Sequence, residues 1–246
     1  MYEPAEDSFL LAEEVRRHLN ALPENHKNLQ NLRLRHKWRS LFGDFFHSEF
    51  LRRQKSKISE RSQSLMTLKS QKATIHLRIK KRSLLVFPDK KKAVKILDMG
   101  SGSGIQAEAC LQAGVSKRDI LVADIDQEVV SYLKEKDFKA VHSNLFSKIK
   151  GKFDLIIFNP PYLPEHSKEK GLDTTGGKNG YETIIRFIRQ AKTHLKKGGK
   201  IFLLFSSLSK PEIIKQEAKK YYAIKEKANK KLFFEKLFVF ELKGKN

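Results

Sequence analysis

The chain has 246 residues and is 39% hydrophobic, enough for one α/β domain with a sizeable core. Its single cysteine, Cys110, excludes an intramolecular disulfide and a CxxC zinc site, and its eight histidines show no metal-ligand spacing. No apolar run is long enough to cross a membrane, and the opening MYEPAEDS lacks the basic residues of a signal peptide. We therefore expect a soluble, cytoplasmic protein without a metal site.

The positive charge is concentrated in one region of the chain. Lysine and arginine number 50 against 28 acidic residues, a net charge of +22. Residues 23–92 alone hold 19 of these basic residues and 5 of the acidic ones. A charge of this kind favours nucleic acid or another polyanion as a partner, and we place that contact on residues 23–92.

The first predicted element is a helix over residues 6–20. Residues 23–92 follow it and do not join the pattern of the rest of the chain. Part of this segment has apolar residues at helical spacing among basic ones, and part alternates as a strand or hairpin does. We interpret it as a basic insertion, either a small subdomain or a poorly ordered lobe.

From residue 95 onward, predicted strands and helices alternate with short connections, which is typical of a parallel, doubly wound sheet. A final strand near the C-terminus favours antiparallel insertion, so we expect five parallel strands and a terminal pair, with helices on both faces. The predicted strands are 95–100, 120–126, 140–144, 153–159, 200–207 and 233–242, and the helices are 105–115, 127–137, 181–197 and 211–221.

A glycine-rich turn follows the first of these strands. After Asp98 come Gly100, Gly102 and Gly104, and then a helix. Glycines allow a tight turn that brings backbone N–H groups close to a ligand at the helix N-terminus. The spacing is GxGxG rather than the GxGxxG of dinucleotide sites, and the lysine of a phosphate-binding loop is missing. Alone, the motif is also compatible with a plain tight turn.

The next two strands also end in polar residues. Asp124 ends the second strand where an acid can meet ribose hydroxyl groups, whereas Asp126 is better placed to cap the following helix. Asn144 ends the third strand, where it can meet an adenine amino group or simply turn the chain. Because parallel strands end at the same edge of a sheet, these groups together favour a nucleoside-binding site.

The fourth strand runs into Asn159-Pro160-Pro161-Tyr162. A pair of prolines stops the sheet hydrogen bonds and makes a rigid exit, which is a structural explanation in itself. The side-chain carbonyl of Asn159 and the backbone carbonyl of Pro160 can also accept both hydrogens of a planar –NH2 group, with Tyr162 stacking on it. Holding both hydrogens returns electron density to a poorly nucleophilic nitrogen and positions it, and a sulfonium methyl donor would complete a transfer reaction.

Three stretches together resemble a known family. NPPY, the opening YEPAEDSFLL and the later TTGGKNGYE are similar to motifs of the HemK/PrmC-type class I S-adenosylmethionine-dependent methyltransferases, and among them to the archaeal and eukaryotic release-factor glutamine methyltransferases. The resemblance covers about residues 1–20 and 94–242. It implies a Rossmann-like fold, α/β, with a seven-stranded, mostly parallel sheet. It assigns residues 1–22 and 93–246 to the methyltransferase domain and leaves 23–92 as the insertion.

The resemblance also implies roles for individual residues. Asn159, Pro160 and Tyr162 would be catalytic and, with Pro161, would bind the substrate amide. S-adenosylmethionine would be bound by Ser8, Asp98, Gly100, Gly102, Asp124, Asn144, Leu145 and Asn159. The implied reaction is methylation of the side-chain amide nitrogen of a glutamine, in the GGQ loop of a class I translation release factor. The family often works with a small zinc-binding activator subunit.

Two other functions remain open from the sequence. NPPY and the basic insertion also suit a nucleic-acid amino methyltransferase that acts on adenine N6 or guanine N2. Alternatively, the insertion, which separates Ser8 from Asp98, has impaired catalysis and left an RNA-binding scaffold. We expect methylation of a protein glutamine, because YEPAED and GGKNGYE flank the site.

Overall fold

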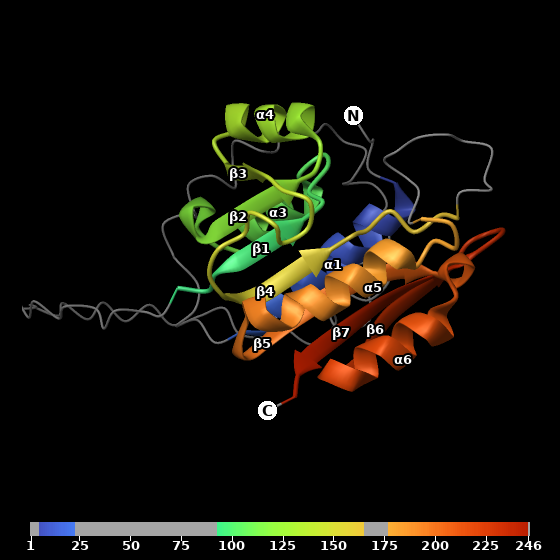
Figure 1. Cartoon of the computed structure of the whole chain (residues 1–246). Helices are drawn as coiled ribbons and strands as arrows, with labels where there is room; N and C mark the ends of the chain where they lie inside the picture. The colour runs from blue at the N-terminus through green and yellow to red at the C-terminus, as the bar shows by residue number, and fades with distance from the viewer. Residues whose placement is uncertain (1–4, 23–92, 165–176, 246) are drawn as a thin grey trace, which may run out of the picture. The chain divides into compact units, whose positions relative to one another are not determined.

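The computed structural model describes residues 5–22, 93–164 and 177–245, all within one compact unit of the chain (Figure 1). The predicted basic insertion, 23–92, lies outside the described residues, and the domain boundaries stay a prediction. No helix among the described residues combines the length and the apolar character needed to cross a membrane.

A seven-stranded sheet forms the centre of this unit, in the order β3-β2-β1-β4-β5-β7-β6. The first five strands in the chain pair in parallel, and β7 lies antiparallel between β5 and β6. This confirms the predicted mostly parallel sheet. The strands are β1 (Ile96–Met99), β2 (Ile120–Asp124), β3 (Lys139–His142), β4 (Phe153–Phe158), β5 (Leu195–Ser206), β6 (Tyr222–Lys231) and β7 (Lys236–Gly244).

Helices cover both faces of the sheet, as Figure 1 shows with α5 and α6 in front of it and α1 behind. Central strands of such a sheet are apolar on both sides. In β4, Leu155 and Ile157 join one core cluster with α1, α3 and α4, whereas Ile156 and Phe158 join another with α5 and α6. The helices are α1 (Glu6–Ala21), α3 (Ile105–Gln112), α4 (Gln127–Glu135), α5 (Glu182–Ala191) and α6 (Pro211–Tyr221).

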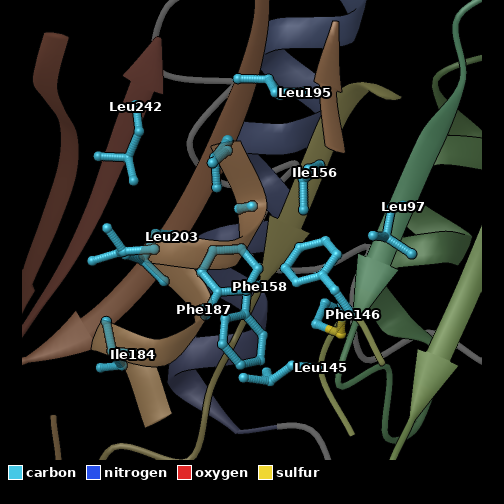
Figure 2. Close-up of a cluster of buried hydrophobic side chains, with 14 of the residues drawn as sticks. Leu97, Leu145, Phe146, Ile156, Phe158, Ile184, Phe187, Leu195, Leu203 and Leu242 are labelled. Atoms are coloured by element: carbon cyan, nitrogen blue, oxygen red, sulfur yellow. The ribbon is translucent and has the colours of Figure 1, made fainter. Parts of the chain in front are cut away.

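Three phenylalanines pack together at the end of β4 that leads into Asn159 (Figure 2). The ring centroids of Phe158 and Phe187 lie 4.4 Å apart, and those of Phe146 and Phe187 lie 5.5 Å apart. All three side chains are buried. Because close-packed aromatic rings leave little freedom of movement, this cluster holds the carboxyl end of β4 firmly.

The predicted helix over residues 181–197 is too long. Helix α5 ends at Ala191, a short 3₁₀ helix follows over Lys192–His194, and β5 already begins at Leu195. The pair Gly198-Gly199, which directly follows the predicted helix, lies inside β5, where the pairing with β4 shifts its register. A glycine pair permits a bulge as readily as it ends a helix, so the sequence did not distinguish the two.

The C-terminal strand also differs from its predicted bounds. We expected a strand over 233–242, but β7 begins at Lys236, and Phe233 and Phe234 lie in the β6–β7 turn, 90% and 85% exposed. Its partner β6 was not located in the sequence, although a terminal pair was expected. Strand β6 is lysine-rich and largely exposed, as suits the edge of a sheet, so its hydrophobic alternation is weak.

Candidate active site

The carboxyl ends of β1, β2, β3 and β4 line a cavity of about 410 Å³. This volume lies within the range of small-molecule and cofactor sites. Ten of the eleven predicted site residues line this cavity. The eleventh, Asp98, does not, but it directly precedes Met99, which does. The ten are Ser8, Gly100, Gly102, Asp124, Asn144, Leu145, Asn159, Pro160, Pro161 and Tyr162.

Asp98 lies within β1 and is 1% exposed. Its Oδ2 accepts a hydrogen bond from the backbone N–H of Ala107, at 3.2 Å, and its Oδ1 has no partner. Burial raises the pKa of this carboxyl to about 7. A buried carboxylate oxygen without a partner is costly, and a ligand that donates a hydrogen bond to it would offset that cost.

The glycine turn after β1 has the conformation that its sequence predicts. Gly100 and Gly102 have φ values of +60° and +50°, which side chains disfavour. A Cβ atom on Gly100 would lie 3.2 Å from the Phe158 ring, so the turn also sits close to the aromatic cluster. The N–H of Gly102 donates to Oδ2 of Asp124, at 3.0 Å, and this bond ties the turn to the end of β2.

Asp126 caps α4, as predicted, whereas Asp124 lines the cavity. Asp124 is buried, and burial raises its pKa, while hydrogen bonds from the N–H groups of Asp126 and Gly102 lower it. The side chain of Asp126 caps α4 by accepting from the N–H of Glu128, at 2.8 Å. Asp124 therefore lines the cavity, and each of its two carboxylate oxygens is fixed by a backbone hydrogen bond.

At the end of β3, Asn144 is exposed and its Oδ1 accepts from Arg186 of α5, at 3.1 Å. Arg186 also lines the cavity and was not identified from the sequence, because an exposed arginine on an amphipathic helix gives no signal of its own. Leu145 is buried with a φ of +47°. The backbone bends here so that Asn144 stays at the rim while Leu145 packs beneath it.

Asn159 is held at the cavity by the N-terminal helix. Its Nδ2 donates to Oδ2 of Asp7, at 3.1 Å, and to Oγ of Ser8, at 3.3 Å. The hydroxyl of Tyr162 donates to the same Oδ2 of Asp7, at 3.3 Å. Asp7 was missed in the sequence, where it read as one of two acids in the first turn of a helix. Helix α1, which contains Ser8, and β1, which contains Asp98, therefore both contribute residues to one cavity, although residues 23–92 separate them in the sequence.

Unpartnered polar atoms gather at this site. Among the described residues, three buried side-chain oxygens lack a hydrogen-bond partner: Oδ1 of Asp98, Oε1 of Gln106 and Oδ1 of Asn159. Gln106 and Asn159 line the cavity. Since buried polar groups are nearly always paired, three acceptors without donors at one site indicate a ligand that supplies donors.

Gly180 packs against the backbone that leaves β4. It belongs to the TTGGKNGYE motif, of which residues 177–182 are described. A Cβ atom at Gly180, whose φ is +80°, would lie 2.4 Å from the carbonyl oxygen of Tyr162. Only glycine permits this approach, so the motif supports the exit segment that contains Tyr162.

Comparison with known proteins places the chain. Residues 81–233 match the family model described as methyltransferase small domain. The chain belongs to this family. The family and the fold make it a class I Rossmann-like methyltransferase, and the methyl donor of this class is S-adenosylmethionine. The matched region does not include α1, which contributes Asp7 and Ser8 to the cavity.

The chain is similar to two curated relatives and to one solved structure, among others. A Methanocaldococcus jannaschii protein, named for an inferred protein N5-glutamine methyltransferase activity, is 36% identical over 157 residues, 58% of this chain and 78% of that protein. Ribosomal RNA small subunit methyltransferase C of Haemophilus influenzae is 31% identical, over 61% of this chain and 44% of its own length. The chain thus spans less than half of this second relative.

The solved structure is the E. cuniculi Mtq2-Trm112 complex, described as responsible for methylation of the translation termination factor eRF1. It matches with a TM-score of 0.51 and 21% identity, over 62% of this chain and 85% of the matched chain. At this identity the likeness concerns the fold, and it agrees with the sheet order and the helices on both faces.

The residues of the cavity fit S-adenosylmethionine. Its amino group and ribose hydroxyls are hydrogen-bond donors, and the cavity lining supplies buried acceptors without donors on Gln106 and Asn159, while Oδ1 of Asp98 lies one residue before the lining. The glycine turn leaves room for close approach of a ligand to the backbone at Gly102, which lines the cavity and has nothing within 4 Å of the position of a Cβ atom. The site is therefore chemically suited to the donor that the family uses.

Replacing Gly180 with alanine is expected to lower methyl transfer by about 100-fold, because the new Cβ would displace the backbone at Tyr162. Gly151→Ala is a matched control: its φ is +92°, but nothing lies within 4 Å of the added atom. Both variants carry backbone strain, so thermal unfolding should shift in both. A turnover of Gly180→Ala equal to that of Gly151→Ala would contradict the supporting role of Gly180.

Proposed function

We propose that the chain methylates the side-chain amide nitrogen of a glutamine in a protein, the GGQ glutamine of a class I translation release factor. The observation that carries the proposal is the buried Oδ1 of Asn159, an acceptor without a donor at the wall of the cavity. A primary amide supplies the hydrogen that this atom lacks. The carbonyl of the adjacent Pro160 is the second acceptor for the same –NH2 group.

The binding residues would act by positioning. S-adenosylmethionine, when bound, supplies an electrophilic methyl group on a sulfonium. Asn159 and Pro160 hold both amide hydrogens, which returns electron density to the nitrogen and orients its lone pair. Tyr162 packs on the plane of the amide. The N–C bond would form as the S–CH3 bond breaks, which leaves S-adenosylhomocysteine, and the methylated nitrogen would then release one proton to water. Alignment of the two reactants can supply about 7 kcal/mol of the barrier without a separate base.

The methyl donor would be held by the wall of the cavity that α1 and the carboxyl ends of β1, β2 and β3 form. Asp98, one residue before the lining, would offer its unpartnered Oδ1 to a donor group, and Asp124, which lines the cavity, would accept from ribose hydroxyls. The remaining residues proposed for this wall are Ser8, Gly100, Gly102, Asn144, Leu145 and the shared Asn159. Asn159 thus lies where donor and acceptor sites meet, which is what transfer between them requires.

A protein substrate is supported by the relative from Methanocaldococcus jannaschii, which is named for protein N5-glutamine methylation and of which the chain spans 78%. The opening YEPAED and the later GGKNGYE point the same way, since they resemble the release-factor subgroup. In this proposal the enzyme works in the cytoplasm, where release factors act, and a small zinc-binding subunit assists it.

A second candidate is methylation of an amino group in RNA. It is favoured by the ribosomal RNA methyltransferase relative and by the net charge of +22. An exocyclic base –NH2 would meet the same two acceptors. The basic residues 23–92, which lie outside the described residues, would then contact RNA.

Labelled methyl transfer separates the two candidates. The protein is incubated with methyl-labelled S-adenosylmethionine and, separately, with a GGQ release factor, its Gln→Ala variant and total RNA. We expect label on the release factor and none on the variant. Label only in RNA would replace the first candidate with the second, and absence of cofactor binding in titration calorimetry would support a scaffold without activity.

A further inference from the structure

Asp7 has an unusual position for an acid in the first turn of a helix. Such residues are normally exposed, where they interact with the helix dipole. Asp7 is only 4% exposed, and its carboxylate is used on both sides. Oδ1 accepts from the N–H of Ser8, at 2.6 Å, and Oδ2 accepts from Asn159 and Tyr162, at 3.1 and 3.3 Å. The bond between Asp7 and Asn159 joins residues 152 positions apart in the chain.

These bonds determine which way the amide of Asn159 faces. Nδ2 carries the two donors of the side chain, and it is directed at two acceptors, Asp7 and Ser8. A flipped amide would place its oxygen against the Asp7 carboxylate, where acceptor would face acceptor. Asp7 therefore excludes the flipped form, and Oδ1 of Asn159 is left at the cavity without a partner.

The direction of this amide decides what the site can hold. With Oδ1 available, the site accepts hydrogens from an –NH2 group. If Nδ2 took the place of Oδ1, the site would present hydrogen-bond donors to the –NH2 group, which is itself a donor. The same carboxylate oxygen also receives the Tyr162 hydroxyl, so Asp7 links the two side chains that would contact the methyl acceptor.

We propose that Asp7 is a positioning residue for methyl transfer. It keeps Oδ1 of Asn159 facing the cavity as a hydrogen-bond acceptor, and it orients Tyr162. The proposal rests on the proposed function in that the group being held is an –NH2. Asp7 acts through Asn159 and Tyr162 and does not itself need to touch either reactant. The residue comes from α1, outside the region that matches the family model, so the helix completes the site as well as packing on α3.

The test uses the full chain with Asp7→Asn and Asp7→Ala. Glu13→Gln is the matched control, because Glu13 is an exposed acid on the same helix and pairs with Arg17. Asparagine has the shape of aspartate but can donate to the oxygen of a flipped Asn159. Turnover is measured with the GGQ release factor, and the Kd for S-adenosylmethionine is measured by titration calorimetry.

We expect both Asp7 variants to lower turnover by about 10- to 100-fold, with the Kd for S-adenosylmethionine changed by less than about threefold and with Glu13→Gln like wild type. In the Asn159→Ala background, where only the contact with Tyr162 is left to lose, Asp7→Asn should cause a smaller further loss than it does in wild type. Wild-type turnover in Asp7→Asn, or a loss that adds in full to that of Asn159→Ala, would overturn the proposal.

A second readout does not depend on the methyl acceptor. In protein labelled with ¹⁵N-asparagine, the two Nδ2 hydrogens of Asn159 should be protected against exchange, and Asp7→Ala should remove that protection while Glu13→Gln keeps it. Unchanged protection in Asp7→Ala refutes the positioning role. If wild type labels no GGQ protein, the proposed function fails, and the exchange result alone then decides the role of Asp7.

Discussion

Replacing Asn159 with alanine is expected to lower the turnover number for methyl transfer by about 10²- to 10³-fold. The variant removes the buried acceptor Oδ1, and loss of one preorganised hydrogen-bonding group at a reacting centre has effects of this size. The Kd for S-adenosylmethionine should rise by less than about tenfold, since most of the donor site is untouched. Radiometric turnover assays and titration calorimetry measure the two quantities.

Asn229→Ala is the control for this prediction. Asn229 is an exposed residue of β6, and its side chain bonds only locally, to Glu226. Its replacement should leave turnover unchanged. If Asn159→Ala also retained wild-type turnover, NPPY would be a strand-ending turn and the role proposed for it would be lost.

Asp98→Asn is expected to raise the stability of the ligand-free protein at pH 8 and, at the same pH, to weaken the binding of S-adenosylmethionine. Burial raises the pKa of Asp98 to about 7 from 3.8. The folded chain therefore holds a proton that the unfolded chain releases, and this group's contribution to the free energy of unfolding falls as pH rises from about 4 to about 7. The change is on the order of 4 kcal/mol. Asparagine cannot ionise, so without ligand the variant should unfold at a higher temperature than wild type at pH 8, and this difference should shrink as pH falls toward 4.

The same substitution should weaken S-adenosylmethionine binding by about 10- to 100-fold at pH 8, as expected for loss of a hydrogen bond to a charged group. In wild type the Kd should rise as pH falls below about 7, because the carboxylate becomes protonated, whereas Asp98→Asn should lack this dependence. Asp119→Asn, at a partly exposed carboxylate outside the cavity, is the control. A wild-type Kd independent of pH between 5.5 and 8.5 would contradict the role of Asp98.

Much of the fold could be predicted because the strands of a parallel sheet are buried and read as apolar runs. FDLIIF is such a run, and it forms β4 within one residue of its predicted end. The predictions failed where local chemistry is ambiguous. Gly198-Gly199 stands in a strand rather than after a helix, and the lysine-rich β6 lacks a hydrophobic alternation because it is an edge strand.

The candidate site was predictable to the extent that it lies at strand ends. Asp124, Asn144 and Asn159 follow apolar runs, so the topology of the sheet brings them together. Asp7 and Arg186 lie on helices, and their positions depend on how those helices pack against the sheet. Spacing along the chain does not contain that information, so both residues were found only in three dimensions.

The most direct test is the mass-spectrometric location of the added methyl group. A GGQ release factor is incubated with S-adenosylmethionine and either wild-type enzyme or Asn159→Ala, then digested and sequenced by fragmentation. We predict one methyl group on the amide of the GGQ glutamine with wild type, and a reduction of about 10² or more in its yield with Asn159→Ala. A methyl group on any other residue, or equal yield with the two enzymes, would contradict the account.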